Sequence, residues 1–258
     1  MLRKSARINL MTTGQTSDSG FECYPSPKWI RAYYNGYLVI DSKRAVLLRA
    51  EGRPPVYYFP KDDVTMDLLI QTKTPNPVEE REVVRYWGIS VGQRRAEQVA
   101  MEYPDPKYAP SLAGYLTFDW STMDAWFEEQ EEVFVHPRDP RVRIDALQSS
   151  RHVKIVIHGE TVAETRSPVL LFETGLPVRY YIPKTDVRFD LLVDSDHVTY
   201  CPYKGEAHYY SVKVGDNIVE NIAWYYRYPV PESTKIASHV AFYDERLDAF
   251  EVDGEHPN

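Results

Sequence analysis

The sequence is poor in the features that define several common kinds of protein. Its 258 residues include only two cysteines, Cys23 and Cys201, which are too few for a disulfide framework or a four-thiolate zinc site. No stretch reaches the ~20 apolar residues of a membrane span, and no apolar run of signal-peptide length follows the first methionine. We therefore expect a cytoplasmic protein that has no membrane partner.

The chain also lacks a broad positive charge and the common catalytic motifs. Its formal net charge of −8 provides no basic surface for a polyanion, so we expect no nucleic-acid partner. No glycine-rich dinucleotide motif, P-loop or His-Glu-x-x-His motif occurs. Asp194 and Asp196 form a spaced carboxylate pair, but Asp and Ser in such a place commonly make turns. We expect neither a metal nor a cofactor.

The composition that is present favours β-structure. Hydrophobic residues make up 43% of the chain and charged residues 26%, which are ordinary values for a globular protein. The 20 tyrosines and 19 prolines, against 12 glycines, favour strands joined by rigid turns. The composition therefore predicts a mainly β protein.

An internal repeat is the strongest pattern in the sequence. At an offset of 123 residues, glycine, proline, tyrosine and leucine positions coincide over about a hundred residues, which indicates two copies of one domain. The matching pairs include Gly36 with Gly159, Leu48 with Leu171, Gly52 with Gly175, Pro54 with Pro177, Tyr57-Tyr58 with Tyr180-Tyr181, Pro60-Lys61 with Pro183-Lys184, and Val91-Gly92 with Val214-Gly215.

The repeat defines the expected domain organisation. We assign residues 1–26 to a flexible N-terminal tail, 27–135 to the first repeat, 136–150 to a linker and 151–254 to the second repeat. An acidic run at residues 128–132 is typical of a solvated face or linker, and the two prolines that follow exclude a continuous helix between the copies. Each copy has about 110 residues, an ordinary domain size.

Each copy is expected to be an antiparallel sheet domain with one short helix. Asn35-Gly36 and His158-Gly159 are turn signals between alternating segments, and they predict hairpins. In the second copy, residues 231–240 suit a short helix that begins near a proline. Residues 240–252 then alternate as a final pair of strands around the segment 244–246.

Several motifs of the second copy resemble the domain-of-unknown-function family number 427 in its tandem form. They are Gly-Leu-Pro-x-Arg-Tyr-Tyr-Ile-Pro-x-x-Asp-Val at residues 175–187, Thr-x-Cys-Pro-Tyr-Lys-Gly at 199–205, Ala-Trp-x-Tyr at 223–226 and Phe-Tyr-Asp-Glu-Arg-Leu-Asp at 242–248. The resemblance covers residues 28–135 and 140–254. It implies a β-tent-like fold and leaves the activity open, although members are sometimes labelled nucleotidyltransferase-like. The Cys-x-x-Cys pairs of zinc-bearing β-tents have no counterpart here.

The two copies differ in their polar groups. Where the second has Glu173, the first has Ala50, and where the second has Trp224, the first has Met101. In the repeat alignment the segment 201–205, Cys-Pro-Tyr-Lys-Gly, is matched by Val-Glu-Glu-Arg-Glu at 78–82. This pattern predicts a site in the second copy and a degenerate one in the first. The alternative is that residues 78–82 form a merely different loop.

Three residues of the second copy are candidate catalytic groups. Cys201 is either a thiolate nucleophile or a simply buried thiol. Lys204 is either an anion-binding or basic group or a solvated lysine of a turn. Glu173 lies in an apolar run, so an inward-facing carboxylate needs a partner such as Arg179 or Lys204, or else its pKa rises. Glu173 then acts in acid–base chemistry or in a structural ion pair.

Aromatic residues and one arginine are candidates to line a small-molecule pocket, although the same rings also serve as sheet packing. These candidate ligand-binding residues are Arg179, Tyr180, Tyr181, Tyr203, Tyr209, Trp224 and Tyr226.

The sequence supports two classes of function. In one, the second repeat is an enzyme-like pocket that applies acid–base or thiol chemistry to a small anionic or aromatic molecule. In the other, the tandem is a non-catalytic binding or scaffold module built as an internal pseudo-dimer. In either case we expect a small-molecule ligand and a monomer or weak homodimer.

Overall fold

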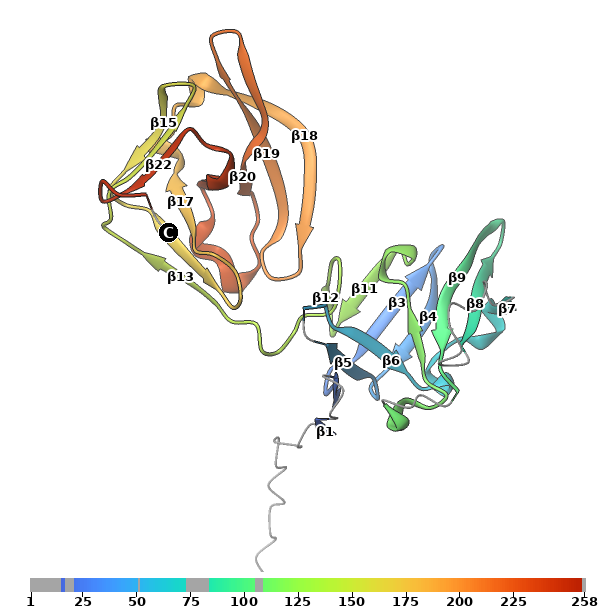
Figure 1. Ribbon diagram of the computed structural model, residues 1–258. Helices are drawn as coiled ribbons and strands as arrows, with labels where there is room; N and C mark the ends of the chain where they lie inside the picture. Colours follow the sequence, from blue (N-terminus) through green and yellow to red (C-terminus); the bar gives the residue numbers. More distant parts are fainter. Residues whose placement is uncertain (1–14, 17–20, 51, 73–83, 105–108, 257–258) are drawn as a thin grey trace, which may run out of the picture. The chain divides into compact units, whose positions relative to one another are not determined.

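The computed structural model describes residues 15–16, 21–50, 52–72, 84–104 and 109–256. The chain divides into two compact units, Met1–Asp139 and Pro140–Asn258. Each unit consists of antiparallel sheets with minimal helix (Figure 1). The mainly β, tandem architecture predicted from the sequence is confirmed.

The first unit contains an eight-stranded sheet in the order β1-β2-β5-β6-β10-β9-β8-β7 and a four-stranded sheet in the order β12-β11-β3-β4. The strands are β1 (Gln15–Thr16), β2 (Phe21–Pro25), β3 (Ile30–Tyr34), β4 (Tyr37–Ser42), β5 (Val46–Ala50), β6 (Val56–Phe59), β7 (Leu69–Thr72), β8 (Arg85–Val91), β9 (Arg94–Glu102), β10 (Leu116–Phe118), β11 (Ala125–Glu128) and β12 (Glu131–Glu132).

The second unit contains a seven-stranded sheet in the order β13-β16-β17-β21-β20-β19-β18 and a three-stranded sheet in the order β15-β14-β22. The strands are β13 (Ile144–Gln148), β14 (Val153–Ile157), β15 (Glu160–Thr165), β16 (Val169–Glu173), β17 (Arg179–Pro183), β18 (Leu192–Cys201), β19 (Gly205–Val214), β20 (Asn217–Tyr226), β21 (His239–Phe242) and β22 (Ala249–Val252).

The strand register is the same in the two large sheets. Met101 on β9 lies opposite Thr117 on β10, and Trp224 on β20 lies opposite Ala241 on β21. The order β2-β5-β6-β10-β9-β8 in the first unit therefore corresponds to β13-β16-β17-β21-β20-β19 in the second. This correspondence lets each position of one repeat be compared with its counterpart in the other.

Both expected hairpins form. Asn35 and Gly36 have φ of 49° and 76°, and His158 and Gly159 have φ of 50° and 78°. Two successive residues with positive φ produce the tight turn whose twist matches that of the flanking strands. The turns connect β3 to β4 and β14 to β15.

The helical segments are all short 3₁₀ turns within the described residues. Of the segment 231–240 expected as a short helix, only Pro231–Ile236 forms a 3₁₀ turn, η7, and the end of the segment already belongs to β21, which begins at His239. The others are η1 (Lys61–Asp63), η2 (Met66–Leu68), η3 (Pro110–Leu112), η4 (Trp120–Thr122), η5 (Lys184–Asp186), η6 (Phe189–Leu191) and η8 (Asp244–Arg246).

Two segments differ from the sequence-based expectation. Phe21–Pro25, placed in the tail, forms β2 against β5, and Ile144–Gln148, placed in the linker, forms β13 against β16. The backbone N–H and C=O groups of β2 and β13 form hydrogen bonds with the outer edges of β5 and β16. The residues that match between the repeats do not predict this pairing. Residues 1–14 and 17–20 of the expected tail lie outside the described residues.

The final two strands do not pair with each other. β21 pairs with β17 and β20 in the seven-stranded sheet, whereas β22 pairs with β14 in the three-stranded sheet. The intervening η8 carries the chain from one sheet to the other. Alternation predicted both strands correctly but not their partners, because period-two patterning fixes the faces of a strand and not its neighbour.

Each unit packs its two sheets over an apolar core. In the first unit Ile40 from β4, Phe59 from β6 and Trp126 from β11 are almost fully buried. In the second, Ile182 from β17 takes the place of Phe59, and Phe250 from β22 takes the place of Trp126. No helix in the described part of the chain is long and apolar enough to cross a membrane.

Candidate functional site

Glu173 and Lys204 form an ion pair in the second repeat. Glu173 ends β16, and Lys204 lies in the turn between β18 and β19, where its Nζ donates to Glu173 Oε2. The two side chains are only 10% and 12% exposed. Since a buried charge must be paired, Lys204 is the partner that the apolar surroundings of Glu173 require.

Three aromatic candidates form a buried group beside this pair. Trp224 Nε1 donates to Tyr181 Oη at 3.3 Å, and both rings are buried with Tyr226. Burial raises the pKa of Tyr181 and of Tyr226, and the nearby charges of Cys201 and Glu173 raise both further. Cys201 and Glu173 are therefore close enough to Tyr181 and Tyr226 to affect their pKa values, and the two phenols stay protonated.

The other candidates lie apart from the ion pair. Arg179 binds Asp244 and Glu245, the latter at 3.1 Å, and its guanidinium lies 5.7 Å from the Trp224 ring. Tyr180 packs edge-on against Phe250.

Tyr209 and Tyr203 have their own partners. Tyr209 Oη shares a 2.9 Å hydrogen bond with Thr199 Oγ1 and lies 3.3 Å from Tyr243 Oη. Burial raises the pKa of Tyr243 to about 12. The Tyr203 carbonyl accepts a hydrogen bond from Ser233. Tyr209 therefore packs as part of the sheet, whereas Tyr203 lies in the turn between β18 and β19.

In the second repeat the space beside Arg179 is small, whereas a separate cavity of about 270 Å³ is lined by residues of η8 and β22. A cavity of about 10 Å³ lies beside Arg179, which is near the minimum that holds one water molecule. Its lining residues are Ile155, Val178, Arg179, Tyr180, Phe242, Asp244 and Phe250.

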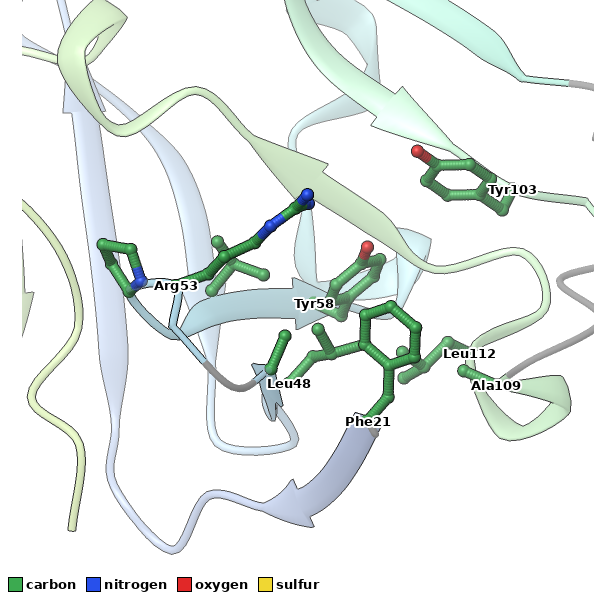
Figure 2. Close-up of a pocket in the computed structure, with 10 residues that line it drawn as sticks. Phe21, Leu48, Arg53, Tyr58, Tyr103, Ala109 and Leu112 are labelled. Atoms are coloured by element: carbon green, nitrogen blue, oxygen red, sulfur yellow. The ribbon is translucent and has the colours of Figure 1, made fainter. Parts of the chain in front are cut away.

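In the first repeat a cavity larger than the one beside Arg179 lies at the end of β5, which corresponds to the Glu173 end of β16. This inner cavity has a volume of about 300 Å³ and is mostly apolar (Figure 2). It is lined by Phe21, Leu48, Ala50, Arg53, Pro54, Val56, Tyr58, Tyr103, Ala109 and Leu112.

A second, outer cavity of about 540 Å³ adjoins it and shares Arg53, Pro54, Val56 and Tyr58. One wall contains Trp120 and Trp126, whose rings stack at 4.3 Å. The remaining lining residues are Pro55, Tyr57, Met101, Thr117, Phe118, Asp119, Val135, His136 and Pro137.

Side-chain size accounts for the difference between the repeats. The strand register aligns Ala50 with Glu173, Val56 with Arg179 and Met101 with Trp224. Each first-repeat residue is the smaller one, and all three line the cavities. The substitutions that the sequence analysis interpreted as loss of a site therefore coincide with open space.

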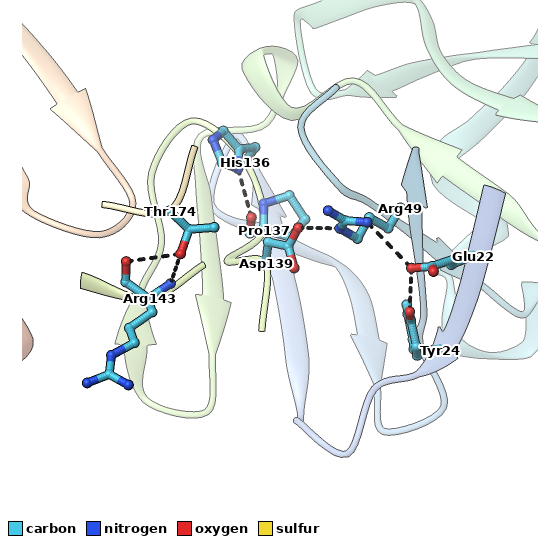
Figure 3. Close-up of polar contacts among 8 residues, drawn as sticks. All are labelled: Glu22, Tyr24, Arg49, His136, Pro137, Asp139, Arg143 and Thr174. Carbon is cyan, nitrogen blue, oxygen red and sulfur yellow. Dashed lines mark hydrogen bonds and ion pairs between the residues drawn. The ribbon is translucent and has the colours of Figure 1, made fainter. Parts of the chain in front are cut away.

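Polar contacts hold the segment that closes the outer cavity. Arg49 Nε donates to Asp139 at 2.7 Å, and Glu22 lies on the other side of the same guanidinium (Figure 3). The His136 ring contacts the Pro137 carbonyl at 2.7 Å. The Arg49–Asp139 contact holds the end of this segment against β5, and His136 and Pro137 line the cavity.

No metal centre is built from the described residues, since they contain no group of three or more His, Cys, Asp and Glu side chains placed to hold an ion. Asp194 and Asp196 lie on β18, and the Ser195 hydroxyl between them donates to Asn221. This segment is thus an irregular strand edge.

The fold and cavities define a protein of two tandem antiparallel β-domains with an apolar groove in the first. The chain belongs to the DUF427 family, whose model, described as a domain of unknown function, matches residues 22–129 and 145–253. The family resemblance noted in the motifs is thereby confirmed. No curated protein matches the chain.

Proposed function

We propose that this protein is a non-catalytic binding module that holds a small organic molecule in the groove of its first repeat. The two adjoining cavities of about 300 and 540 Å³ carry this proposal. Ligand sites in proteins commonly have volumes of about 300–1,000 Å³ and largely apolar walls. In the second repeat the space beside Arg179 is only about 10 Å³, and the cavity of about 270 Å³ at η8 is lined by Asp244, Glu245 and Asp248, so the first repeat offers the larger apolar site.

The lining of the groove supports binding without turnover. The described residues that line it include no Cys, Ser, Lys or Glu. The carboxylate among them, Asp119, accepts hydrogen bonds from Ser121 and Thr122 at the start of η4. The histidine among these lining residues, His136, directs a ring nitrogen at the Pro137 carbonyl, which is not the nucleophile beside a general base that covalent catalysis usually requires.

Binding of 2-naphthylmethanol, a neutral aromatic probe, tests the proposal. Val56 lies where the two cavities meet, and Val56→Trp puts an indole into the opening. The matched control is Ile70→Trp, at an exposed residue of β7 that lines neither cavity. We expect calorimetry to show binding to the parent and to the control, and at least tenfold weaker binding to Val56→Trp. Equal binding to both variants would refute the proposal.

A second candidate is thiol or acid–base catalysis in the second repeat. The position of Cys201 and Glu173 near the buried Tyr226, whose pKa both raise, supports it. Cys201 would attack an activated acyl group, with Lys204 and Glu173 as proton-transfer partners. A burst of nitrophenol from p-nitrophenyl acetate that Cys201→Ala abolishes and Cys23→Ala preserves would favour this candidate. A burst that survives both substitutions would dismiss it.

We further propose that the small molecule is the main partner and that the chain acts as a monomer or weak homodimer. The two family domains within one chain support this assignment, because they provide internally the pair that a homodimer would provide. A tight dimer in analytical ultracentrifugation at micromolar concentration would contradict it.

A further inference from the structure

We infer that the groove of the first repeat takes an aromatic carboxylate: an aromatic ring in the outer cavity and a carboxylate at Arg53. This inference rests on the proposed function and adds the chemical class of the ligand. Three observations support it: the position of Arg53, the aromatic wall of the outer cavity, and the side chains that fill the same places in the second repeat.

Arg53 is the only cation among the described residues that line the two cavities, and it lines both. Its backbone N–H donates to the Ala50 carbonyl at 3.3 Å, which fixes the start of the side chain. Within the described part of the chain its guanidinium forms neither an ion pair nor a side-chain hydrogen bond. Figure 2 shows the side chain extended toward the side where Tyr58 and Tyr103 lie. It is therefore free to bind an anion.

A carboxylate fits this guanidinium better than a more highly charged group. One arginine provides two parallel N–H donors, which match the two oxygens of a carboxylate. A phosphate group usually gathers several donors or a helix N-terminus, whereas the walls around Arg53 are mainly Pro54, Val56 and Leu48. A ligand that carries one negative charge on an otherwise apolar body therefore complements both Arg53 and the apolar walls.

The outer cavity is suited to a flat ring. Trp120 and Trp126 stack with an interplanar angle of 12°, and Tyr57 and Phe118 complete an aromatic wall. Aromatic rings pack favourably on such surfaces, with a contribution beyond simple area burial.

The second repeat places these two chemical groups at the corresponding positions. Glu173 brings a carboxylate to the place of Ala50, where Lys204 binds it. Trp224 brings an indole to the place of Met101, where it packs at 4.5 Å from Tyr243 and against Tyr181. In the second repeat the fold thus accommodates a carboxylate and an aromatic ring of its own side chains at these two positions. In the first repeat, a ligand that carries both groups would fill the same two positions.

Two probes with the same ring, 2-naphthylmethanol and 2-naphthylacetate, test the inference by calorimetry on the full chain. We expect the acetate to bind about fivefold more tightly than the alcohol, since an exposed ion pair contributes up to about 1 kcal/mol. Arg53→Gln is expected to remove this advantage and to leave the alcohol unaffected. A matched control, Arg95→Gln, changes an exposed arginine of β9 that lines neither cavity and should preserve the advantage.

The outcomes separate the two proposals. If the alcohol binds in the groove and the acetate binds no more tightly, the carboxylate inference is wrong and the proposed function stands. If neither probe binds, both are overturned. If 2-naphthyl phosphate binds tenfold more tightly than the acetate and loses that gain in Arg53→Gln, the ligand is a phosphate ester and the carboxylate inference fails.

Discussion

The two repeats place different side chains on the same scaffold. At the end of β5 the first repeat has Ala50, and at the end of β16 the second has Glu173, whose carboxylate is paired with Lys204. The first position borders a cavity of about 300 Å³. Alanine and the paired glutamate are both compatible with the same sheet order and turns, because the backbone hydrogen bonds do not depend on these side chains.

Buried carboxylates also occupy different positions in the two repeats. In the first, Glu128 on β11 is 7% exposed, accepts a 2.7 Å hydrogen bond from Tyr57 and pairs with Lys28. The strand register puts Val252 at the corresponding position of the second repeat. Each copy therefore carries its own buried polar group at a place where the other is apolar. The two repeats therefore share their sheet order but differ in the positions at which they bury a carboxylate.

The largest expected effect comes from giving the second repeat the residue of the first. Glu173→Ala leaves Lys204 buried without its partner, and loss of one member of a buried pair costs about 3–5 kcal/mol of unfolding free energy. Urea unfolding measures this loss. The exposed Glu220 on β20 is a suitable control, since Glu220→Ala should change stability by less than about 0.5 kcal/mol.

The double variant Glu173→Ala/Lys204→Met sharpens the same comparison. It removes both charges, so most of the stability should return, as expected when a buried pair is replaced by apolar groups. If Glu173→Ala alone is as stable as Glu220→Ala, the ion pair is not what distinguishes the two repeats at this position.

A smaller effect is expected where the repeats have the same residue in different surroundings. Tyr57→Phe removes the hydroxyl that donates to the buried Glu128, at a cost of about 1–3 kcal/mol. Its counterpart Tyr180 packs against Phe250, and no hydrogen bond of its hydroxyl occurs within the described residues. Tyr180→Phe is therefore the matched control and should be nearly neutral. Equal losses in thermal unfolding of the two variants would contradict this difference.

Features that depend on local chemistry could be predicted from the sequence. The hairpins follow from Gly36 and Gly159, because a turn with positive φ favours glycine wherever it occurs. The repeat register followed from the same residues and from paired prolines. The need of Glu173 for a cation also followed from its apolar neighbours, and the structure supplies Lys204.

Cavities and the pairing of strands that are distant in the sequence could not be predicted. The groove exists because Ala50 and Met101 are smaller than their counterparts Glu173 and Trp224, and no single residue type marks an empty space. Comparing the sizes of paired residues in the two repeats was the signal that could have found it. The pairing of β2 with β5 and the separation of β21 from β22 depend on contacts that a period-two pattern does not specify.

The smallest effect concerns the two hairpin turns. Asn35 and His158 have nearly the same positive φ, but asparagine adopts the left-handed region more readily than most residues. His158→Asn should therefore stabilise the second repeat by about 0.5 kcal/mol, in the range of conformational substitutions at compatible sites. Asn35→His is the reciprocal change, and it should cost more because the Asn35 amide also donates to the Val91 carbonyl at 3.0 Å. If urea unfolding shows that both substitutions destabilise equally, the hydrogen bonds and not the backbone preference determine the residue at each turn.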